Sequence, residues 1–540
     1  MCNVRCIKCL FFFLLFIFFK QINGFAQSAV NPNSKQINII QADTLRFKKL
    51  NDTTNLQILS GHVVVKQQNN TFYCDSAILN QVTNTLEAFG HVHINNADSV
   101  HTYSDYLRYV GNDKTAFLRK NVRLTDGKGT LTTPELDYNT QTKIGIYRSG
   151  GTLVNGTTTL TSKDGYYYGQ TRDASFKNNV VLINPDYKVT TDTLLYNTYT
   201  NIATFTVPTK IISGKRIINT SNGYYNLTTK QSYFGSRPII QDSTSILIAD
   251  ETASEDSTGN FEARGNAVYR DIAQGYALFA NNIKGNKKTS VVLATEKPVM
   301  MVKQNNDSLF IAADTLFSAK LSSIIGTRDI PQVRDSTPSP DSITLTKQDS
   351  SKDRYIEAYY HVRIYSDSLQ ATGDSLFYSA TDSVFRLLKN PVIWANNSQI
   401  TGDTIYLYTK NKKPERVKVF ENALAISDVD SSQFFNQIKG RIINGYFLNG
   451  SINFIHTQGN AESVYYTQDD DKKFIGVDKS SCDVIDTYFK DQRPEKVARL
   501  YNLKGTFYPM QQVNHESLKL RGFNWQNNTR PKSREELFGN

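Results

Sequence analysis

Ala42-Asp43-Thr44-Leu45-Arg46-Phe47, Ser104-Asp105-Tyr106-Leu107-Arg108-Tyr109 and Gly373-Asp374-Ser375-Leu376-Phe377-Tyr378 share one pattern: a small residue, Asp, any residue, Leu, any residue and an aromatic residue. A second half-unit follows the first, as in Leu86-Glu87-Ala88-Phe89-Gly90-His91-Val92-His93-Ile94, and it recurs in Phe261-Glu262-Ala263-Arg264-Gly265-Asn266-Ala267-Val268-Tyr269. The two halves repeat together about every thirty residues, which predicts a solenoid of stacked units.

The acidic position of the first half-unit marks the register. Successive marks lie 28 to 32 residues apart at Asp43, Asp75, Asp105, Glu135, Asp164, Asp192, Asn222 and Asp250. The longer interval between Asp314 and Asp374 contains a near copy of the second half-unit, residues 356–364, displaced by an insertion. We therefore expect one solenoid domain over residues 37–480, with a disordered Pro- and Ser-containing insertion at 326–353 and a cap or docking tail at 481–540.

Composition and alternation indicate an all-β protein. Tyr and Phe number thirty each, Pro only fourteen, and helix-period apolar patterns are almost absent. Each unit reads as two strands that alternate apolar and polar residues, so each strand has one dry and one wet face. The dry-face residues expected to line the interior are Val63, Val65, Val92, Ile94, Val122, Leu124, Val180, Leu182, Val362 and Ile364. His62, His91, His93, Arg123 and Arg363 lie on the wet face.

The amino terminus predicts export. Arg5 and Lys8 precede an apolar run from Leu10 to Phe19, and Gly24-Phe25-Ala26 offers a cleavage site, so residues 1–26 are typical of a signal peptide, followed by an extension at 27–36. The run is about half of what spans a bilayer. Without Arg5, Lys8 and Lys20 the net charge of +11 becomes 11 minus 3, or +8, which suits an anionic partner or simple solubility. Export disfavours nucleic acid.

No residue cluster predicts catalysis. The Asp series suits turns, where an Asp accepts a backbone N–H. His62, His91, His93 and His101 lie in adjacent units but lack the Cys or acidic ligands of a metal site. We expect no enzyme, metal or cofactor. Cys74 occupies the small-residue position before Asp75, so it should pack as a small apolar group rather than join Cys482 in a disulfide.

The strands Gly61-His62-Val63-Val64-Val65 and Gly90-His91-Val92-His93-Ile94, each after a small-Asp-x-Leu strand, resemble the OstA/LptA family, and residues 520–525 with Arg530-Pro531 are similar to the longer OstA-like proteins of the Bacteroidetes. The resemblance implies an open antiparallel β-jellyroll, or β-taco, in the periplasm, with outer-membrane association as a further expectation. It implies lipopolysaccharide or lipid A as the ligand. The implied partners are other β-taco proteins, joined through strand edges, and an outer-membrane assembly barrel.

Two questions stay open at the level of sequence. The apolar stripes are consistent with an interior packed shut as well as with a trough for acyl chains, and the sequence does not identify an open seam. Two other functions also remain: a secreted structural or adhesive β-solenoid, and a polysaccharide-active enzyme on a parallel β-helix.

Overall fold

The computed structural model describes residues 36–50, 55–96, 100–273, 275–304, 307–324, 353–410, 413–429, 433–448, 451–469, 471, 473–490 and 493–539. The expected signal peptide at 1–26 lies outside the described residues, as do the extension at 27–36 and the insertion at 326–353 except for their last residues, 36 and 353. These three assignments stay predictions.

The chain divides into two compact units. Unit 1 contains Met1–Thr125 and Glu135–Lys143, and unit 2 contains Asp126–Pro134 and Ile144–Asn540. Neighbouring strands are antiparallel in both units, as in β3 with β4 and β13 with β14. The all-β, antiparallel class is therefore confirmed, whereas the open jellyroll and a single continuous solenoid over 37–480 stay predictions.

The strands of unit 1 are β1 (Asn38–Gln41), β2 (Thr44–Lys49), β3 (Asn55–Gln67), β4 (Asn70–Asn80), β5 (Thr85–Asn96), β6 (Val100–Val110), β7 (Thr115–Thr125) and the end of β8 (Gly129–Asn139). The strands of unit 2 are the start of β8, β9 (Ile144–Tyr147), β10 (Gly151–Asn155), β11 (Thr158–Ser162), β12 (Asp164–Tyr168), β13 (Asp173–Asn184), β14 (Tyr187–Asn197), β15 (Ile202–Phe205), β16 (Thr209–Ser213), β17 (Arg216–Thr220), β18 (Asn222–Asn226), β19 (Gln231–Gly235), β20 (Ile239–Gln241), β21 (Ser245–Ile248), β22 (Glu251–Glu255), β23 (Asn260–Asp271), β24 (Tyr276–Asn286), β25 (Val291–Thr295), β26 (Val299–Gln304), β27 (Asp307–Ala312), β28 (Thr315–Ala319), β29 (Tyr355–Tyr365), β30 (Gln370–Ser379), β31 (Val384–Leu388), β32 (Val392–Ala395), β33 (Ser398–Thr401), β34 (Thr404–Lys410), β35 (Lys413–Asp428), β36 (Phe435–Leu448), β37 (Ser451–Gln468), β38 (Phe474–Lys490), β39 (Arg493–Leu500) and β40 (Lys504–Pro509). Short 3-10 helices η2 (Leu321–Ser323), η3 (Met510–Gln512) and η4 (His515–Leu518) and the helix α1 (Arg534–Leu537) complete unit 2.

Each long strand turns a corner at its middle. In β5 the register against β6 shifts between Phe89 and Val92, and Gly90 (φ +73°) and His91 (φ +44°) adopt left-handed backbone. Such a bulge bends a strand. The corner divides β5 into two segments. We call the segment before it (85–89), together with the strand segments that pair with it, wall A. We call the segment after it (92–96), together with its paired segments, wall B. The alternation continues through the corner, so both walls turn apolar side chains to one interior.

The repeated Asp holds this corner in place. In the corner of β5, Asp75 Oδ2 lies 2.8 Å from His91 Nδ1, and a Cβ on Gly90 would lie 2.2 Å from the same oxygen. The Asp side chain accepts the same kind of hydrogen bond from a His or Asn at the next corner in Asp43–His62, Asp105–Asn121, Asp250–Asn266, Asp314–His361, Asp403–Asn422 and Asp483–Asn502. The Asp series is thus structural, but the partner is a side chain of the adjacent strand rather than the local backbone N–H that we expected.

Strand pairing in unit 2 continues on both sides of the insertion and beyond residue 480. Ala319 in β28 pairs with Tyr355 in β29, so the two ends of the insertion meet on neighbouring strands. At the other end β38 pairs with both β39 and β40. The paired strands therefore extend to Pro509, past the expected limit of the solenoid, and include one more Asp-held corner at Asp483.

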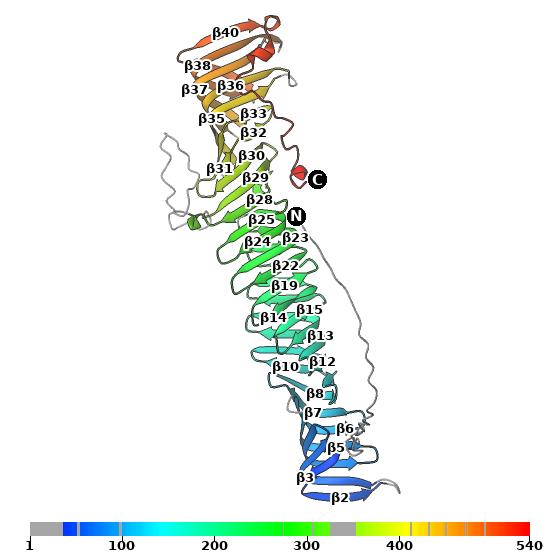
Figure 1. Cartoon of the computed structure of the whole chain (residues 1–540). Coiled ribbons are helices and arrows are strands. Elements are labelled where there is room, and N and C mark those ends of the chain that lie inside the picture. The colour runs from blue at the N-terminus through cyan, green and yellow to red at the C-terminus, as the bar shows by residue number, and fades with distance from the viewer. Residues whose placement is uncertain are drawn as a thin grey trace, which may run out of the picture. The chain divides into compact units, whose positions relative to one another are not determined.

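The last part of the chain, residues 513–539, runs back along the strands of unit 2 (Figure 1). Its hydrogen bonds place it on the outer face of wall B. Leu520 N–H donates to Gln437 Oε1 (2.8 Å), Gln399 Nε2 donates to the Asn524 carbonyl (2.7 Å), and Arg530 donates to Gln370 Oε1 (2.8 Å). Wall B is therefore covered on both faces here. We call this segment the C-terminal strap.

Candidate functional site

The interior between the two walls is the feature that the sequence singled out. All ten predicted dry-face residues are buried, with relative exposures of 0–4%. They are Val63, Val65, Val92, Ile94, Val122 and Leu124 in unit 1, and Val180, Leu182, Val362 and Ile364 in unit 2. Their inward orientation agrees with the expected alternation, while their contact with acyl chains stays a prediction.

Sequence reasoning named only one wall of this interior. All ten residues belong to wall B, and the opposite wall contributes its own buried residues, such as Leu86, Ala88, Leu107 and Leu118. The signal that could have found them is the first half-unit itself. Its Leu position, Leu107 in β6, pairs directly with Ala88 in β5 and Leu118 in β7.

In unit 1, polar side chains join the two walls at the edge away from the corners. The hydroxyl of Tyr109 in wall A donates to Oε1 of Gln67 in wall B (2.5 Å). One rung further on, Asn96 Nδ2 in wall B donates to the hydroxyl of Tyr138 (3.1 Å). All four residues are buried. Burial raises the pKa of Tyr138 to about 12, so this hydroxyl is protonated and able to hydrogen-bond at neutral pH.

The same arrangement continues in unit 2. Tyr167 donates to Asp126 Oδ2 (2.6 Å), and Asn155 Nδ2 donates to the Tyr196 hydroxyl (3.1 Å). Burial acts to raise the pKa of Asp126, but the hydrogen bonds from Tyr167 and from neighbouring backbone N–H groups bring it below its usual value. The aromatic position of the first half-unit is therefore a Tyr in these rungs because its hydroxyl bridges the walls. We call these pairs the seam bonds.

The amino-terminal edge of unit 1 leaves the interior incomplete. Leu45 in β2 pairs with Leu59 in β3, and paired residues point to the same face, so Leu45 faces the interior. Leu59 is fully buried, whereas Leu45 is 46% exposed and Phe47 is 67% exposed. No described strand pairs with the other edge of β2. This edge is thus an unpaired strand backed by an exposed apolar end of the interior.

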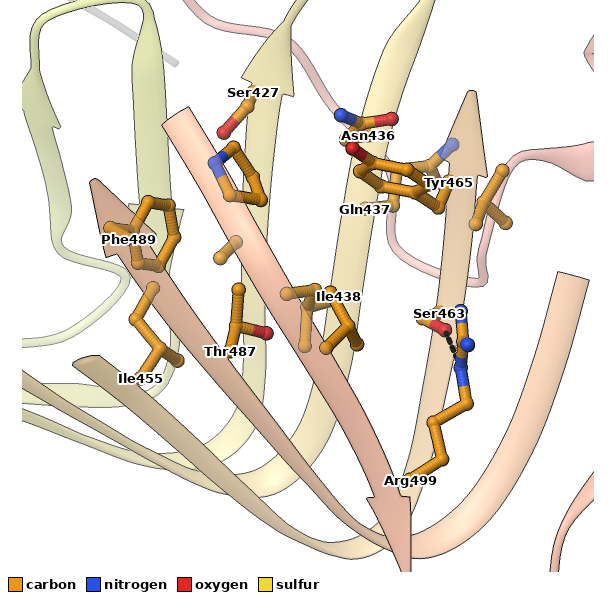
Figure 2. A pocket seen from close by; sticks show the side chains of 14 residues that line it. Ser427, Asn436, Gln437, Ile438, Ile455, Ser463, Tyr465, Thr487, Phe489 and Arg499 are labelled. Atoms are coloured by element: carbon orange, nitrogen blue, oxygen red, sulfur yellow. Dashed lines mark hydrogen bonds between the residues drawn. The ribbon is translucent and has the colours of Figure 1, made fainter. Parts of the chain in front are cut away.

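Towards the carboxyl end of unit 2 the interior contains two cavities. One, of about 10 Å³, is lined by apolar residues that include Leu369, Leu407 and Phe447. The other, of about 50 Å³, lies between the walls at β35 to β39 and mixes apolar residues with Ser463, Thr487 and Arg499 (Figure 2). A water molecule needs roughly 10–15 Å³, so the larger cavity has room for a small chemical group.

The outer surface of unit 1 holds the histidines that raised the question of a metal. His62 and His91 are exposed, and an Asp hydrogen bond raises the pKa of each. His93 is half-buried, stacks on Tyr103 at 4.5 Å between ring centroids, and lies 3.1 Å from His101 between ring nitrogens. In the described part of the chain no three His, Cys, Asp or Glu side chains gather into a metal site.

Neither cysteine of the described residues is oxidised: Cys74 and Cys482 are both buried free thiols. Burial raises the pKa of Cys74 to about 12, as expected for a small apolar packing group. Among the described helices, none has the length and apolar character to cross a membrane.

One protein-family model and a solved structure are similar to parts of this chain. The model of the OstA-like protein family matches residues 34–192 and 188–250. This segment of the chain is similar to the OstA-like family. The solved structure of LptH from Pseudomonas aeruginosa, described as the LptA-homologous periplasmic component of the lipopolysaccharide transport device, is 20% identical with a TM-score of 0.18 and covers 21% of this chain and 82% of its own. A comparison with curated proteins finds no match.

The OstA-like segment contains the unpaired edge strand, the seam bonds and eight of the ten predicted interior residues. It runs through unit 1 and into unit 2 as far as Asp250. Val362, Ile364, both interior cavities and the C-terminal strap lie after it. The chain therefore continues the antiparallel walls well beyond its OstA-like segment.

Proposed function

We propose that this chain is a periplasmic lipid-binding protein that takes part in lipopolysaccharide transport to the outer membrane and assembly there, with acyl chains held between the two walls. The observation that carries the proposal is an apolar interior bounded by antiparallel walls in a chain with an OstA-like segment. Transfer of each methylene from water to such an interior stabilises the complex by about 0.8 kcal/mol. The proposal requires no catalytic group.

A crosslinking experiment tests this interior. A photoreactive diazirine analogue of leucine placed at Ile94, which is fully buried, should crosslink to lipopolysaccharide in cells that make it. The matched control is the same analogue at His93, the next residue along β5, which points to the outer face. Equal crosslinking at the two positions, or none at Ile94, would refute an acyl-chain site between the walls.

The amino-terminal edge supports the proposed partners, other β-taco proteins of a transport bridge. An unpaired strand edge offers backbone N–H and C=O groups to another chain. A strand added beside β2 would also cover the exposed Leu45 and Phe47, so it would gain both hydrogen bonds and apolar burial. An outer-membrane assembly barrel is proposed for the opposite, carboxyl-terminal end, and a cleaved signal peptide at residues 1–26 would supply the periplasmic address.

A charged residue at position 45 tests whether a partner strand pairs with the free edge of β2. We expect Leu45→Lys to abolish disulfide or photocrosslinks formed from β2 to a partner chain in cells, because the added strand would bury an unpaired ammonium. The control is Arg46→Lys, which keeps an exposed cation on the outer face of the same strand. Crosslinks that persist in Leu45→Lys, or that arise only from the carboxyl-terminal strap, would show that the polarity is wrong.

A structural β-solenoid is the second candidate, and the seam bonds favour it. Pairs such as Gln67–Tyr109 and Asn96–Tyr138 join the walls across the interior, and all four residues are buried. A ligand that enters sideways must break such pairs, whereas a spacer keeps them. The third possibility, an enzyme on a parallel β-helix, conflicts with the antiparallel pairing of the strands.

A further inference from the structure

The interior changes its chemistry towards the carboxyl end of unit 2. In β35, wall B turns Ala423 and Ala425 inward, and both pack in the main apolar cluster. Two strands later the inward position is Ser463, which lies 3.1 Å from Ser480 in β38, hydroxyl to hydroxyl. Ser480 in turn donates to Asp478 Oδ1 (2.9 Å). A polar strip thus replaces the apolar wall at the last rungs.

The guanidinium of Arg499, a residue of wall A, reaches this polar strip. Arg499, on β39, donates from Nε to Ser463 Oγ (3.4 Å; Figure 2). Its Nη2 lies 3.4 Å from Asp478 Oδ1. The guanidinium and the carboxylate cancel each other, so the strip carries no net charge. We call the cavity beside Arg499 and Ser463 the terminal chamber.

The terminal chamber contains an unsatisfied hydrogen-bonding group. The hydroxyl of Thr487, in wall A, is 1% exposed as a residue and has no hydrogen-bond partner among the described residues. Leaving a buried hydroxyl unpaired is unfavourable. Thr487 lines the chamber and lies opposite Ile438 of wall B, so a group bound in the chamber is within its reach (Figure 2).

The rest of the lining is mixed. Ser427, Asn436 and Gln437 are polar and hydrogen-bonded, and Tyr465 also lines the chamber. Ile438, Ile455, Phe489 and Val497 surround the polar side chains and offer a surface for an aliphatic chain. The chamber therefore combines apolar side chains, hydrogen-bonded polar side chains, one unpaired hydroxyl and an ion pair without net charge. An uncharged hydrogen-bonding group fits this combination, because an added charge would meet either Asp478 or Arg499 without a free counter-ion.

We infer that the terminal chamber binds the uncharged polar end of an aliphatic amphiphile, such as a hydroxyl, ester or amide group, with Thr487 as its hydrogen-bonding residue. This inference rests on the proposed function, since it places the polar group at one end of the same interior. It identifies the last rungs as a selective end site rather than a continuation of a uniform apolar trough.

The test uses the mature chain and three soluble probes: monododecanoylglycerol, which is uncharged, dodecanoate, which is anionic, and dodecyltrimethylammonium, which is cationic. Native mass spectrometry or displacement of a fluorescent acyl probe gives the affinities. We expect the uncharged probe to bind most tightly. Thr487→Val, which removes the hydroxyl at nearly constant volume, should weaken that binding about tenfold, the equivalent of one hydrogen bond of about 1.4 kcal/mol.

Two variants keep the test decisive. Thr487→Ser retains the hydroxyl and should bind like the unmodified chain. Thr252→Val removes another buried, unpaired hydroxyl of unit 2 that does not line the chamber, and it should change nothing. Equal binding by Thr487→Val, a preference for a charged probe, or no binding of any probe would overturn the inference. Crosslinking at Ile94 is a separate readout, so either idea can fail alone.

Discussion

Gln399 holds the C-terminal strap to the outer face of wall B, and its loss should release the strap. This residue is fully buried and makes three hydrogen bonds. Its Nε2 donates to the Asn524 carbonyl (2.7 Å), and its Oε1 accepts from Gln526 N–H (2.7 Å) and from Trp394 Nε1 (3.2 Å). Gln399→Leu removes all three and leaves each partner unpaired.

The expected cost follows from these bonds. The Trp394 bond joins two residues of wall B, so only the bonds to Asn524 and Gln526 hold the strap. At about 1 kcal/mol for each hydrogen bond, these two stabilise the docked strap by about 2 kcal/mol. Every 1.4 kcal/mol is a factor of ten, so the released fraction should rise roughly 30-fold.

Tryptophan fluorescence reports this release directly. The chain has two tryptophans, Trp394 and Trp525, and both lie at the strap interface. Trp394 is 0% exposed on wall B, and Trp525 of the strap packs on Phe435 at 5.3 Å between ring centroids. We expect a red shift and faster iodide quenching in Gln399→Leu, with faster hydrogen exchange in residues 518–538.

The control is Gln231→Leu, which changes an exposed glutamine elsewhere in unit 2 and should alter neither signal. Unchanged emission and unchanged exchange in Gln399→Leu would show that other contacts hold the strap. The reasoning that assigns about 2 kcal/mol to the two strap bonds of Gln399 would then be wrong.

Three further predictions concern unit 1. Ile94→Asp should lower the free energy of unfolding by more than about 3 kcal/mol in a denaturant titration, because it buries an unpaired charge; a loss below 1 kcal/mol would contradict the buried position. The Asp75 bond raises the pKa of His91, so the protonated corner is the stabilised one: exchange protection should be complete below about pH 6.5 and decline as the pH rises through the raised pKa. His91→Asn should flatten this profile, and an unchanged profile would refute the assignment. Tyr138→Phe, which removes the bond from Asn96, should cost about 1 kcal/mol and speed local hydrogen exchange, whereas unaltered exchange would show that this seam bond contributes nothing.

In the OstA-like segment, the inner and outer faces of the strands could be predicted from the sequence. Alternation placed Val92 and Ile94 on the inner face because successive side chains of a strand point to opposite sides. The same reasoning placed His91 on the outside, where the structure has it. It did not find the bond between His91 and Asp75, since that bond joins residues of two strands whose register only the folded sheet sets.

The limit of the solenoid shows a signal that was present but overlooked. Cys482-Asp483-Val484-Ile485 repeats the small-Asp-x-Ile pattern, and Asp483 accepts a bond from Asn502 (2.8 Å) like the other corner pairs. The spacing to the previous mark is irregular, because β35 to β38 are longer than the earlier strands. The last corner was not predicted because its distance from the previous Asp differs from thirty residues, although its motif is present.

The sequence by itself determined the repeat, the antiparallel β class and the inner face of wall B, because these depend on local alternation and on a motif that recurs at a nearly constant spacing. Tertiary structure alone decided how the walls are joined and covered. Seam bonds such as Tyr109–Gln67 link residues 42 positions apart, and Arg530 reaches Gln370 across 160 positions. Such contacts depend on which strands stack opposite each other, and no local pattern of residues encodes that distance.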